Sequence, residues 1–453
     1  MSKRNLIFSI IIVAGLATAA WMVFNQSSAL KIPLVSKGAR VTGPSEVTVG
    51  YGWSVKPDVK QAIQEAVISA SEEFNGSQPD YAILLSNEQY DSKVLVKELK
   101  RLWPNTRVHG GTTMYGKYTR DGYHYSPTGS LALMAISSPK IKVGVGGAEV
   151  GKISAQAAGK KAIETALKDA GKEGEKPQVI YIIGSFTNEQ GLIEGIESVV
   201  GKDVPIVGGS AFDDAGVGNW SEFVNDEVYT NGVALTAFFT DLTVGTAYES
   251  GYEKTKFKGT ITKAKGAVIY EINNRPALEV YDEWSGGLVT SVRADSKAET
   301  ITEIVKTALL PLAKVLKGTN GEVHYIPMHP YFWNLKDKTV STGVNVEVGD
   351  EITIMHGTWE ANVNHAVNTS TQALENSGLK KGEAYFAIYT YCLGKMQTIP
   401  AEERNKIPLL VNDTLGDIPF IAGNTGGEQG YLRGVGNEHA GLSNTMIIFG
   451  PKK

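Results

Sequence analysis

The chain has 453 residues, a net charge of −4 at pH 7 and one cysteine, Cys392. This length predicts more than one domain, and 42% hydrophobic with 20% charged residues is typical of a globular protein. The slight acidity and the lack of a basic stripe argue against nucleic acid as a partner. A single cysteine excludes an intramolecular disulfide and a cysteine-based zinc site, and no cofactor is expected.

The N-terminus predicts export. Lys3 and Arg4 precede an uncharged apolar run at 6–24 that is just long enough to span a bilayer. Small residues at 17–19 suit signal peptidase, so residues 1–30 are either a cleaved signal peptide or an anchor. We favour the anchor, a transmembrane helix attaching the protein to the membrane, because the apolar run continues beyond them. Residues 31–52 are then a linker, and the rest is extracytoplasmic, either periplasmic or extracellular.

Three stretches of the chain follow one plan, in which an apolar strand leads through a helix into a second apolar strand. We predict their first strands at 80–86, 179–183 and 387–392. An Asn-Glu-Gln motif opens the helix in the first two, at 87–89 and 188–190. In the third, Pro400 and Pro408 interrupt the helical pattern.

A further apolar strand follows each unit, at 130–136, 232–239 and 444–449. The sequence therefore predicts a mixed α/β fold with two domains, built from strand–helix–strand units that are each closed by an antiparallel hairpin. Additional helices are predicted at 57–75, 153–170 and 296–317.

Glycine-rich turns with a hydroxyl or amide side chain end the second strands. A glycine at such a place permits unusual φ angles and close approach of a ligand, whose anionic group the following N–H groups can hold. The alternative is that the turns are only structural. The three turns are Gly110-Gly111-Thr112-Thr113, Gly208-Gly209-Ser210-Ala211 and Gly423-Asn424-Thr425-Gly426.

Charged residues beside the turns complete the predicted ligand site. Asp213 and Asp214 suit an ammonium group, and Arg433 with Glu428 nearby suits a carboxylate, although all four also fit solvated loops. Arg275 is interpreted as structural first. The predicted ligand-binding residues are Gly110, Gly111, Thr112, Thr113, Gly208, Gly209, Ser210, Asp213, Asp214, Asn424, Thr425, Glu428 and Arg433.

Enzyme and metal signatures are incomplete. Residues 146–152 read as a phosphate-binding loop, but Ile153 stands where a Ser or Thr must hold magnesium. No G-x-S-x-G elbow occurs. His356, Glu360 and His365 lack the spacing of helical metal ligands, so no metal is expected. Cys392 is interpreted as a small hydrophobe.

These motifs, in this order and spacing, resemble paired FIST N and FIST C domains. We assign the first to 53–262 and the second to 263–450. The N-type resemblance rests on 81–86, 110–113, 122–124, 207–211, 213–214 and 231–232, and the C-type resemblance on 272–281, 391–392, 427–428 and 444–445.

The resemblance implies a sensory protein that binds a small ligand, with amino acids or related carboxylates as candidates. No fused output segment is recognisable, so the signal would pass through an unknown partner protein. The competing hypothesis is an envelope enzyme, a hydrolase or transferase, that uses the hydroxyl turns with His124 or His439.

Overall fold

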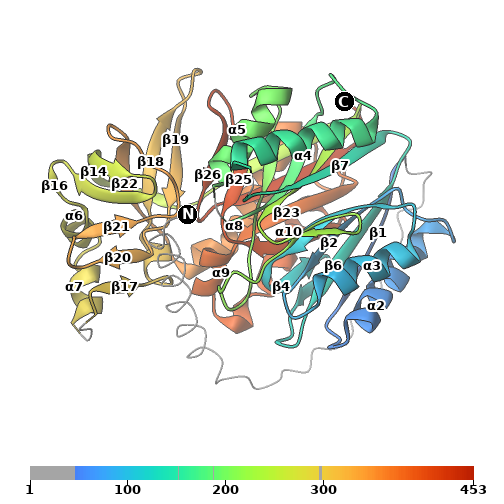
Figure 1. Ribbon diagram of the computed structural model, residues 1–453, viewed down its shortest axis with the longest axis horizontal. Coiled ribbons are helices and arrows are strands. Elements are labelled where there is room, and N and C mark those ends of the chain that lie inside the picture. The colour runs from blue at the N-terminus through green and yellow to red at the C-terminus, as the bar shows by residue number, and fades with distance from the viewer. Residues whose placement is uncertain (1–45, 152, 187, 295–297) are drawn as a thin grey trace.

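The computed structural model describes residues 46–453 except Lys152, Thr187 and 295–297, and Figure 1 shows two bodies. The larger main body contains 46–249 and 357–453. The smaller inserted body, on the left of Figure 1, contains 253–356. The mixed α/β fold is confirmed. The predicted boundary at 262 falls inside one strand, β14 (Glu253–Lys265).

Three six-stranded mixed sheets with equivalent strand orders form the main body. Sheet 1 is β1 (Thr48–Ser54), β6 (Leu131–Ser137), β2 (Tyr81–Ser86), β3 (Arg107–Thr112), β10 (Glu222–Val224), β11 (Glu227–Tyr229). Sheet 2 is β7 (Ile141–Glu149), β12 (Gly232–Thr240), β8 (Val179–Ser185), β9 (Ile206–Ala211), β25 (Glu428–Leu432), β26 (Gly436–Ala440). Sheet 3 is β13 (Thr243–Glu249), β27 (Asn444–Gly450), β23 (Phe386–Cys392), β24 (Phe420–Thr425), β4 (Met114–Thr119), β5 (Gly122–His124).

Each predicted first strand pairs in parallel with its predicted second strand, as β2 with β3, β8 with β9 and β23 with β24. The crossover helices are α3 (Ser92–Leu102), α5 (Glu189–Val200) and the split pair α9 (Leu393–Thr398) and α10 (Lys406–Leu415), with η3 (Ala401–Glu403) between the last two. Pro408 is the third residue of α10, where its missing N–H has no helical acceptor to lose.

The sheets exchange strands in a cycle. The closing strands β6, β12 and β27 are antiparallel to the first strands, as predicted. The strand after a closing strand does not form a hairpin with it but joins the next sheet, so β7 pairs with β12 and β13 with β27. Likewise the hairpin after each second strand pairs outside its own unit: β4 with β24, β10 with β3 and β25 with β9. Consequently no unit completes its own sheet.

A long helix covers the outer edge strand of each sheet: α2 (Val59–Ser71) with η1 (Glu72–Phe74), α4 (Ala155–Ala170) and α8 (Trp359–Ser377). Glycines make these contacts possible. A Cβ at Gly50, Gly144 or Gly245 would lie 2.0, 1.9 or 2.3 Å from a carbonyl oxygen of the covering helix. Side chains Asp58, Ser154 and Thr358 cap the helix N-termini. The predicted helices at 57–75 and 153–170 are therefore confirmed.

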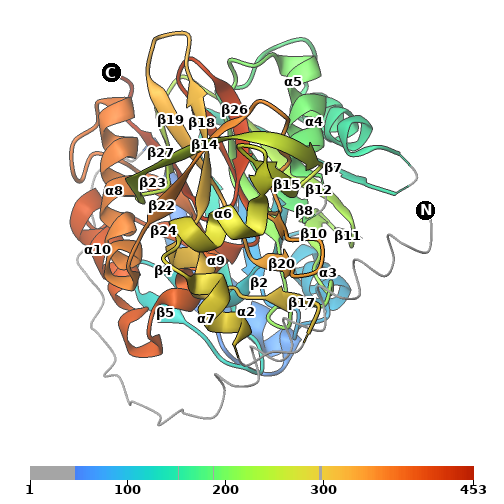
Figure 2. The ribbon, with the colours of Figure 1, turned by 90° about the vertical axis from the view of Figure 1, so that its left-hand side faces the viewer.

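The inserted body is one nine-stranded sheet carrying two short helices, α6 (Ala277–Trp284) and α7 (Leu288–Arg293), which lie in front of it in Figure 2. Its strands besides β14 are β15 (Val268–Ile272), β16 (Arg275–Pro276), β17 (Thr300–Thr302), β18 (Leu312–Lys317), β19 (Val323–Met328), β20 (Phe332–Asn334), β21 (Thr339–Ser341) and β22 (Glu351–His356).

The predicted helix at 296–317 is wrong. Over the described part of that range the chain forms β17, η2 (Thr307–Leu309) and β18. β18 pairs with β19 and β22, so its backbone hydrogen bonds come from the sheet, which overrides the helical propensity of the sequence.

Exposed Arg275 pairs with Glu283 at 2.9 Å, a structural role.

Across the described residues, none of the helices combines the length and apolar character needed to cross a bilayer. The predicted signal peptide or anchor at 1–30 lies outside the described residues.

Candidate functional site

The three glycine-rich turns meet in the centre of the main body. The Phe212 N–H donates to the Thr112 carbonyl oxygen at 3.1 Å, and the Gly426 N–H donates to that of Ser210 at 2.9 Å. A Cβ at Gly423 would lie 2.6 Å from the Thr113 Oγ1, which completes the circle. The convergence follows from the exchanged hairpins, because each turn leads into a hairpin that pairs with another unit's sheet.

Protein carbonyls already satisfy the turn amides that the sequence suggested for anion binding. The N–H groups of Thr112, Thr113 and Ser210 donate to Ser221, Ser86 and Gly427, each at 2.8 Å. The turn residues are also buried, except Gly426, which is half-buried. These glycines therefore serve close packing of one turn on another, and the described turns present no row of free amides to a ligand.

Asp213 is fully used by its own loop. Its carboxylate, 0% exposed, accepts the N–H groups of Val217, Gly218 and Asn219 at 2.8–2.9 Å. The side chain holds the loop between β9 and β10 closed, and an ammonium ligand would have to displace three amides.

Asp214 lies in a cluster of charges at the end of β2. Its Oδ1 accepts from the Asn87 amide at 2.9 Å and from the Tyr115 N–H at 2.5 Å, and its own N–H donates to the Glu88 Oε1 at 3.0 Å. Burial, and then the charge of Asp214, raises the pKa of Glu88 to about 7. Buried Lys117 contributes the opposite charge to this cluster.

Lys117 is completely buried and donates three hydrogen bonds, to Asn87 Oδ1 at 3.2 Å and to the carbonyl oxygens of Thr113 and Tyr115 at 2.9 and 2.7 Å. Burial lowers its pKa to about 7, opposed by the charges of Asp214 and Glu88. Because all three ammonium protons are engaged, Lys117 supports the cluster structurally and is not arranged as a general base.

An equivalent cluster surrounds the second Asn-Glu-Gln motif. The Ser210 hydroxyl donates to Glu189 Oε1 at 3.0 Å, and the Gln429 amide donates to His439 Nδ1 at 3.1 Å and to the Ser210 hydroxyl at 3.3 Å. His439 Nε2 is 3.9 Å from Glu189 Oε2, and all four side chains are buried. Ser210 and His439 are thus joined through Gln429 rather than as a direct nucleophile–base pair.

Two buried glutamates link neighbouring sheets. Glu222 Oε1 accepts from the Ser185 hydroxyl at 2.7 Å, and Glu428 Oε1 accepts from Thr425 Oγ1 at 2.9 Å. Burial raises the pKa of each to about 8, so both carboxyl groups are largely protonated at neutral pH. Glu428 therefore acts as a neutral bridge to the third turn rather than as an exposed carboxylate.

Cys392 and Lys395 lie close to this third turn, in which Thr425 is the register partner of Cys392. Burial raises the pKa of the Cys392 thiol above its usual value, which fits the expected inert hydrophobe. Burial lowers the pKa of Lys395 to about 7, and its ammonium donates to the Ser250 carbonyl oxygen at 2.7 Å and contacts His365 Nδ1.

Arg433 and His124 lie outside the three glycine-rich turns. Exposed Arg433 is at the tip of the β25–β26 hairpin, where its carbonyl oxygen contacts His324 of the inserted body at 3.2 Å. The His124 ring stacks on Trp53 at 3.8 Å, and burial lowers its pKa to about 3. Among the described residues no group of three or more His, Cys, Asp or Glu side chains is placed to hold a metal ion.

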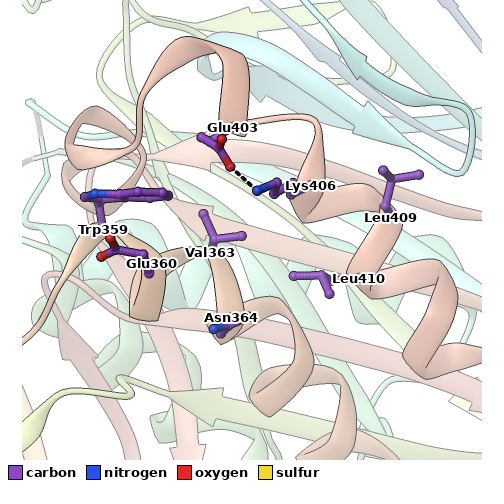
Figure 3. A pocket seen from close by; sticks show the side chains of 8 residues that line it. All are labelled: Trp359, Glu360, Val363, Asn364, Glu403, Lys406, Leu409 and Leu410. Atoms are coloured by element: carbon purple, nitrogen blue, oxygen red, sulfur yellow. Dashed lines mark ion pairs between the residues drawn. The ribbon is translucent and has the colours of Figure 1, made fainter.

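A surface groove of about 370 Å³ runs between α8 and α10. In Figure 3 the Trp359 ring borders one end, Val363 and Leu410 lie between the helices, and Glu403 pairs with Lys406. None of the predicted ligand-binding residues lines it.

The sequence missed Tyr115 and three of its neighbours. Glu88, Tyr115, Gln397 and Arg404 carry no motif that marks them as ligand-binding, although Glu88 belongs to the repeated Asn-Glu-Gln motif. Tyr115 has a φ of +56°, unusual for a bulky residue, and the Arg404 guanidinium lies 5.6 Å from the centre of its ring.

Two known proteins are similar to this chain. The chain is 32% identical over 106 residues to an uncharacterised protein, MJ1623, of Methanocaldococcus jannaschii; the match covers 23% of this chain and only 20% of that relative. A crystal structure of cyanuric acid hydrolase from A. caulinodans is similar over 90% of this chain and all of its own, at 6% identity and a TM-score of 0.35, too low to bear on activity.

Family models give the decisive match. The FIST N domain model matches residues 80–275 and the FIST C domain model matches 277–431. Since the two matches together span most of the chain, the protein belongs to the family that combines a FIST N with a FIST C domain.

Proposed function

We propose that this FIST protein is an extracytoplasmic receptor for a small amino acid or related carboxylate and that it signals through a separate partner protein. FIST domains are associated with sensory signal transduction and small-ligand binding. The finer assignment is supported by one observation in particular. Buried polar atoms of Glu88, Tyr125 and Gln397 have no hydrogen-bond partner in the described structure, and such atoms are costly unless something satisfies them.

A thermal-shift screen of the full-length protein tests the ligand class. The panel contains amino acids, the matching amines and small carboxylates. Binding to the folded state alone adds about 2.7 kcal/mol at a ligand concentration 100-fold above Kd, so a true ligand raises Tm in a dose-dependent way. A panel without any dose-dependent shift contradicts the ligand class.

Localisation is tested separately. The apolar run at 6–24 predicts that a protease added to intact spheroplasts digests the protein, whereas a cytoplasmic control survives. Resistance equal to that of the control contradicts the extracytoplasmic assignment.

The Ser210–Glu189 contact supports a second candidate function, an acyl-transfer enzyme, because the Glu189 carboxylate accepts a hydrogen bond from the Ser210 hydroxyl at 3.0 Å. Incubation with a fluorophosphonate probe tests it: labelling of the wild type that Ser210→Ala abolishes supports an enzyme. Labelling absent from both proteins counts against it.

A further inference from the structure

The side chains that surround Tyr115 gather in one place although they come from distant parts of the chain. Glu88 follows β2, Tyr115 is in β4, Tyr125 follows β5, and Arg404 lies between η3 and α10. Contacts join them: the centre of the Tyr115 ring lies 5.8 Å from that of Tyr125 and 5.6 Å from the Arg404 guanidinium. The Tyr115 N–H donates to Asp214, whose own N–H donates to Glu88.

Within this cluster Asp214 is already balanced and Glu88 is not. Asp214 holds the Asn87 amide and the Tyr115 N–H and lies near the Lys117 ammonium. Glu88 uses Oε1 for the Asp214 N–H, while its Oε2 is buried without a partner. Glu88 is therefore the carboxylate with remaining capacity to accept a hydrogen bond from a ligand.

Arg404 is the matching positive group. Its Nε donates to the Ile399 carbonyl oxygen at 3.3 Å, and the Arg404 side chain also hydrogen-bonds that of Tyr123. None of the ion pairs found among the described residues includes Arg404. The guanidinium stands over the Tyr115 ring, which together with the Tyr123 hydrogen bond orients it and leaves part of its five N–H donors for a planar anion.

Tyr115 lies next to both charged groups and is held there under strain. A left-handed conformation costs a non-glycine residue about 1–2 kcal/mol. The carbonyl oxygen of Tyr115 accepts from Asn87 at 2.9 Å and from Lys117 at 2.7 Å, which fixes that conformation. Strained residues of this kind cluster at ligand sites.

The cluster also reaches the surface. Tyr115 and Asp214 are each 8% exposed, and Glu88, Tyr125 and Arg404 are half-buried. Each of these residues is therefore partly exposed to solvent.

We infer that Glu88 and Arg404, both neighbours of Tyr115, are the ligand-recognising pair, with Glu88 receiving an ammonium group and Arg404 a carboxylate of one zwitterionic ligand. The inference rests on the proposed function and places the ligand at Glu88 and Arg404 instead of at the three turns and Arg433. The central turns form the packed floor, and Arg433, the clamp predicted from the sequence, has no part in it.

Isothermal titration of full-length protein tests this pair. The probes are the twenty common L-amino acids and, for the tightest binder, its decarboxylated amine and its des-amino acid. Arg404→Gln should weaken binding of the amino acid about 10- to 100-fold, the range expected for a charged hydrogen-bonded contact, and leave the amine unaffected. Glu88→Gln should weaken the amino acid and the amine but not the des-amino acid.

Arg433→Gln is the matched control and should bind as the wild type does, with near-UV circular dichroism verifying that every variant is folded. If the wild type binds an amino acid while Arg404→Gln and Glu88→Gln bind it equally well, the site is wrong and the proposed function stands. A loss only in Arg433→Gln likewise overturns the site. If the wild type binds none of the twenty, the zwitterion site falls, and the proposed ligand class falls with it when the small carboxylates of the thermal-shift panel also fail to bind.

Discussion

At Gly110 the chain has no room for a side chain, because a Cβ there would lie 1.8 Å from the backbone oxygen of Leu84. Gly110→Ala should therefore shift two paired strands and lower the free energy of unfolding by about 3 kcal/mol or more, as overpacking of a core does. Urea denaturation measures it. Gly76→Ala, at a φ of +84° with open space around it, should cost only roughly 1–2 kcal/mol. Equal losses would contradict the steric explanation.

Glu222 makes stability depend on pH. Its pKa is raised to about 8 in the folded protein, mainly by burial, from an ordinary value of 4.5. Between these values the folded state keeps a proton that the unfolded state has lost, so stability is greatest below pH 4.5 and falls as pH rises towards 8. The slope attributable to this one group approaches about 1.4 kcal/mol per pH unit.

Glu222→Gln should flatten this slope. Chemical denaturation at a series of pH values from 5 to 8 measures the difference, and exposed Glu253→Gln serves as the control that retains it. An unchanged slope in Glu222→Gln would show that Glu222 ionises in the folded state as it does in the unfolded one.

The candidate site was only partly predictable from single residues. Asp214 follows a glycine turn, a local pattern, and the structure places it in the polar cluster. Arg404 follows a 3₁₀ turn with no motif, and only the packing of α10 against the β5 hairpin brings it to Tyr115. Its role depends on a neighbour some three hundred residues away, which no local pattern encodes.

At the scale of elements, strands and helices were readable because each has its own short period of apolar residues. The sequence did not show which strands pair with one another. Nothing in 114–124 indicates that this hairpin pairs with β24 rather than within its own unit. The failed helix at 296–317 has the same cause, since pairing of β18 in the sheet outweighs the preference of the isolated segment.

Strand exchange predicts that damage in one sheet spreads to the others. Phe223 of β10 is fully buried in the core of sheet 1, although its segment follows the second unit. Phe223→Ala should cost about 3–5 kcal/mol and speed hydrogen exchange in β8 and β23 as well as in β2. Exposed Val323→Ala, in the inserted body, should change neither. Faster exchange confined to β2 and its neighbours would refute cooperative unfolding of the three sheets.

At the scale of the molecule, the inserted body enters and leaves through neighbouring points. Glu253 and His356, at its two ends, are antiparallel register partners, whose Cα atoms are about 5.5 Å apart or less. Replacing 254–355 by a two-glycine linker should therefore leave a folded main body. Its Tm should fall, because Cys392 and Leu442 lose apolar contacts with Ala313 and Met355.

Calorimetry with near-UV circular dichroism checks this excision. A single cooperative transition with aromatic signal is expected. A chain without either would show that the main body depends on the inserted one to fold.

Because hairpins pair with strands of other units, the order of synthesis decides when each sheet can be completed. The Asn424 side chain that bonds to Met114 lies 310 residues further along the chain. A ribosome adding 5–20 residues per second needs roughly 15–60 s to make that stretch. Throughout this interval β4 and β5 have been synthesised but lack the strand that they border, and their tyrosines have no completed core to enter. The nascent protein therefore needs its unpaired β4–β5 hairpin to be protected until its last hundred residues have been synthesised.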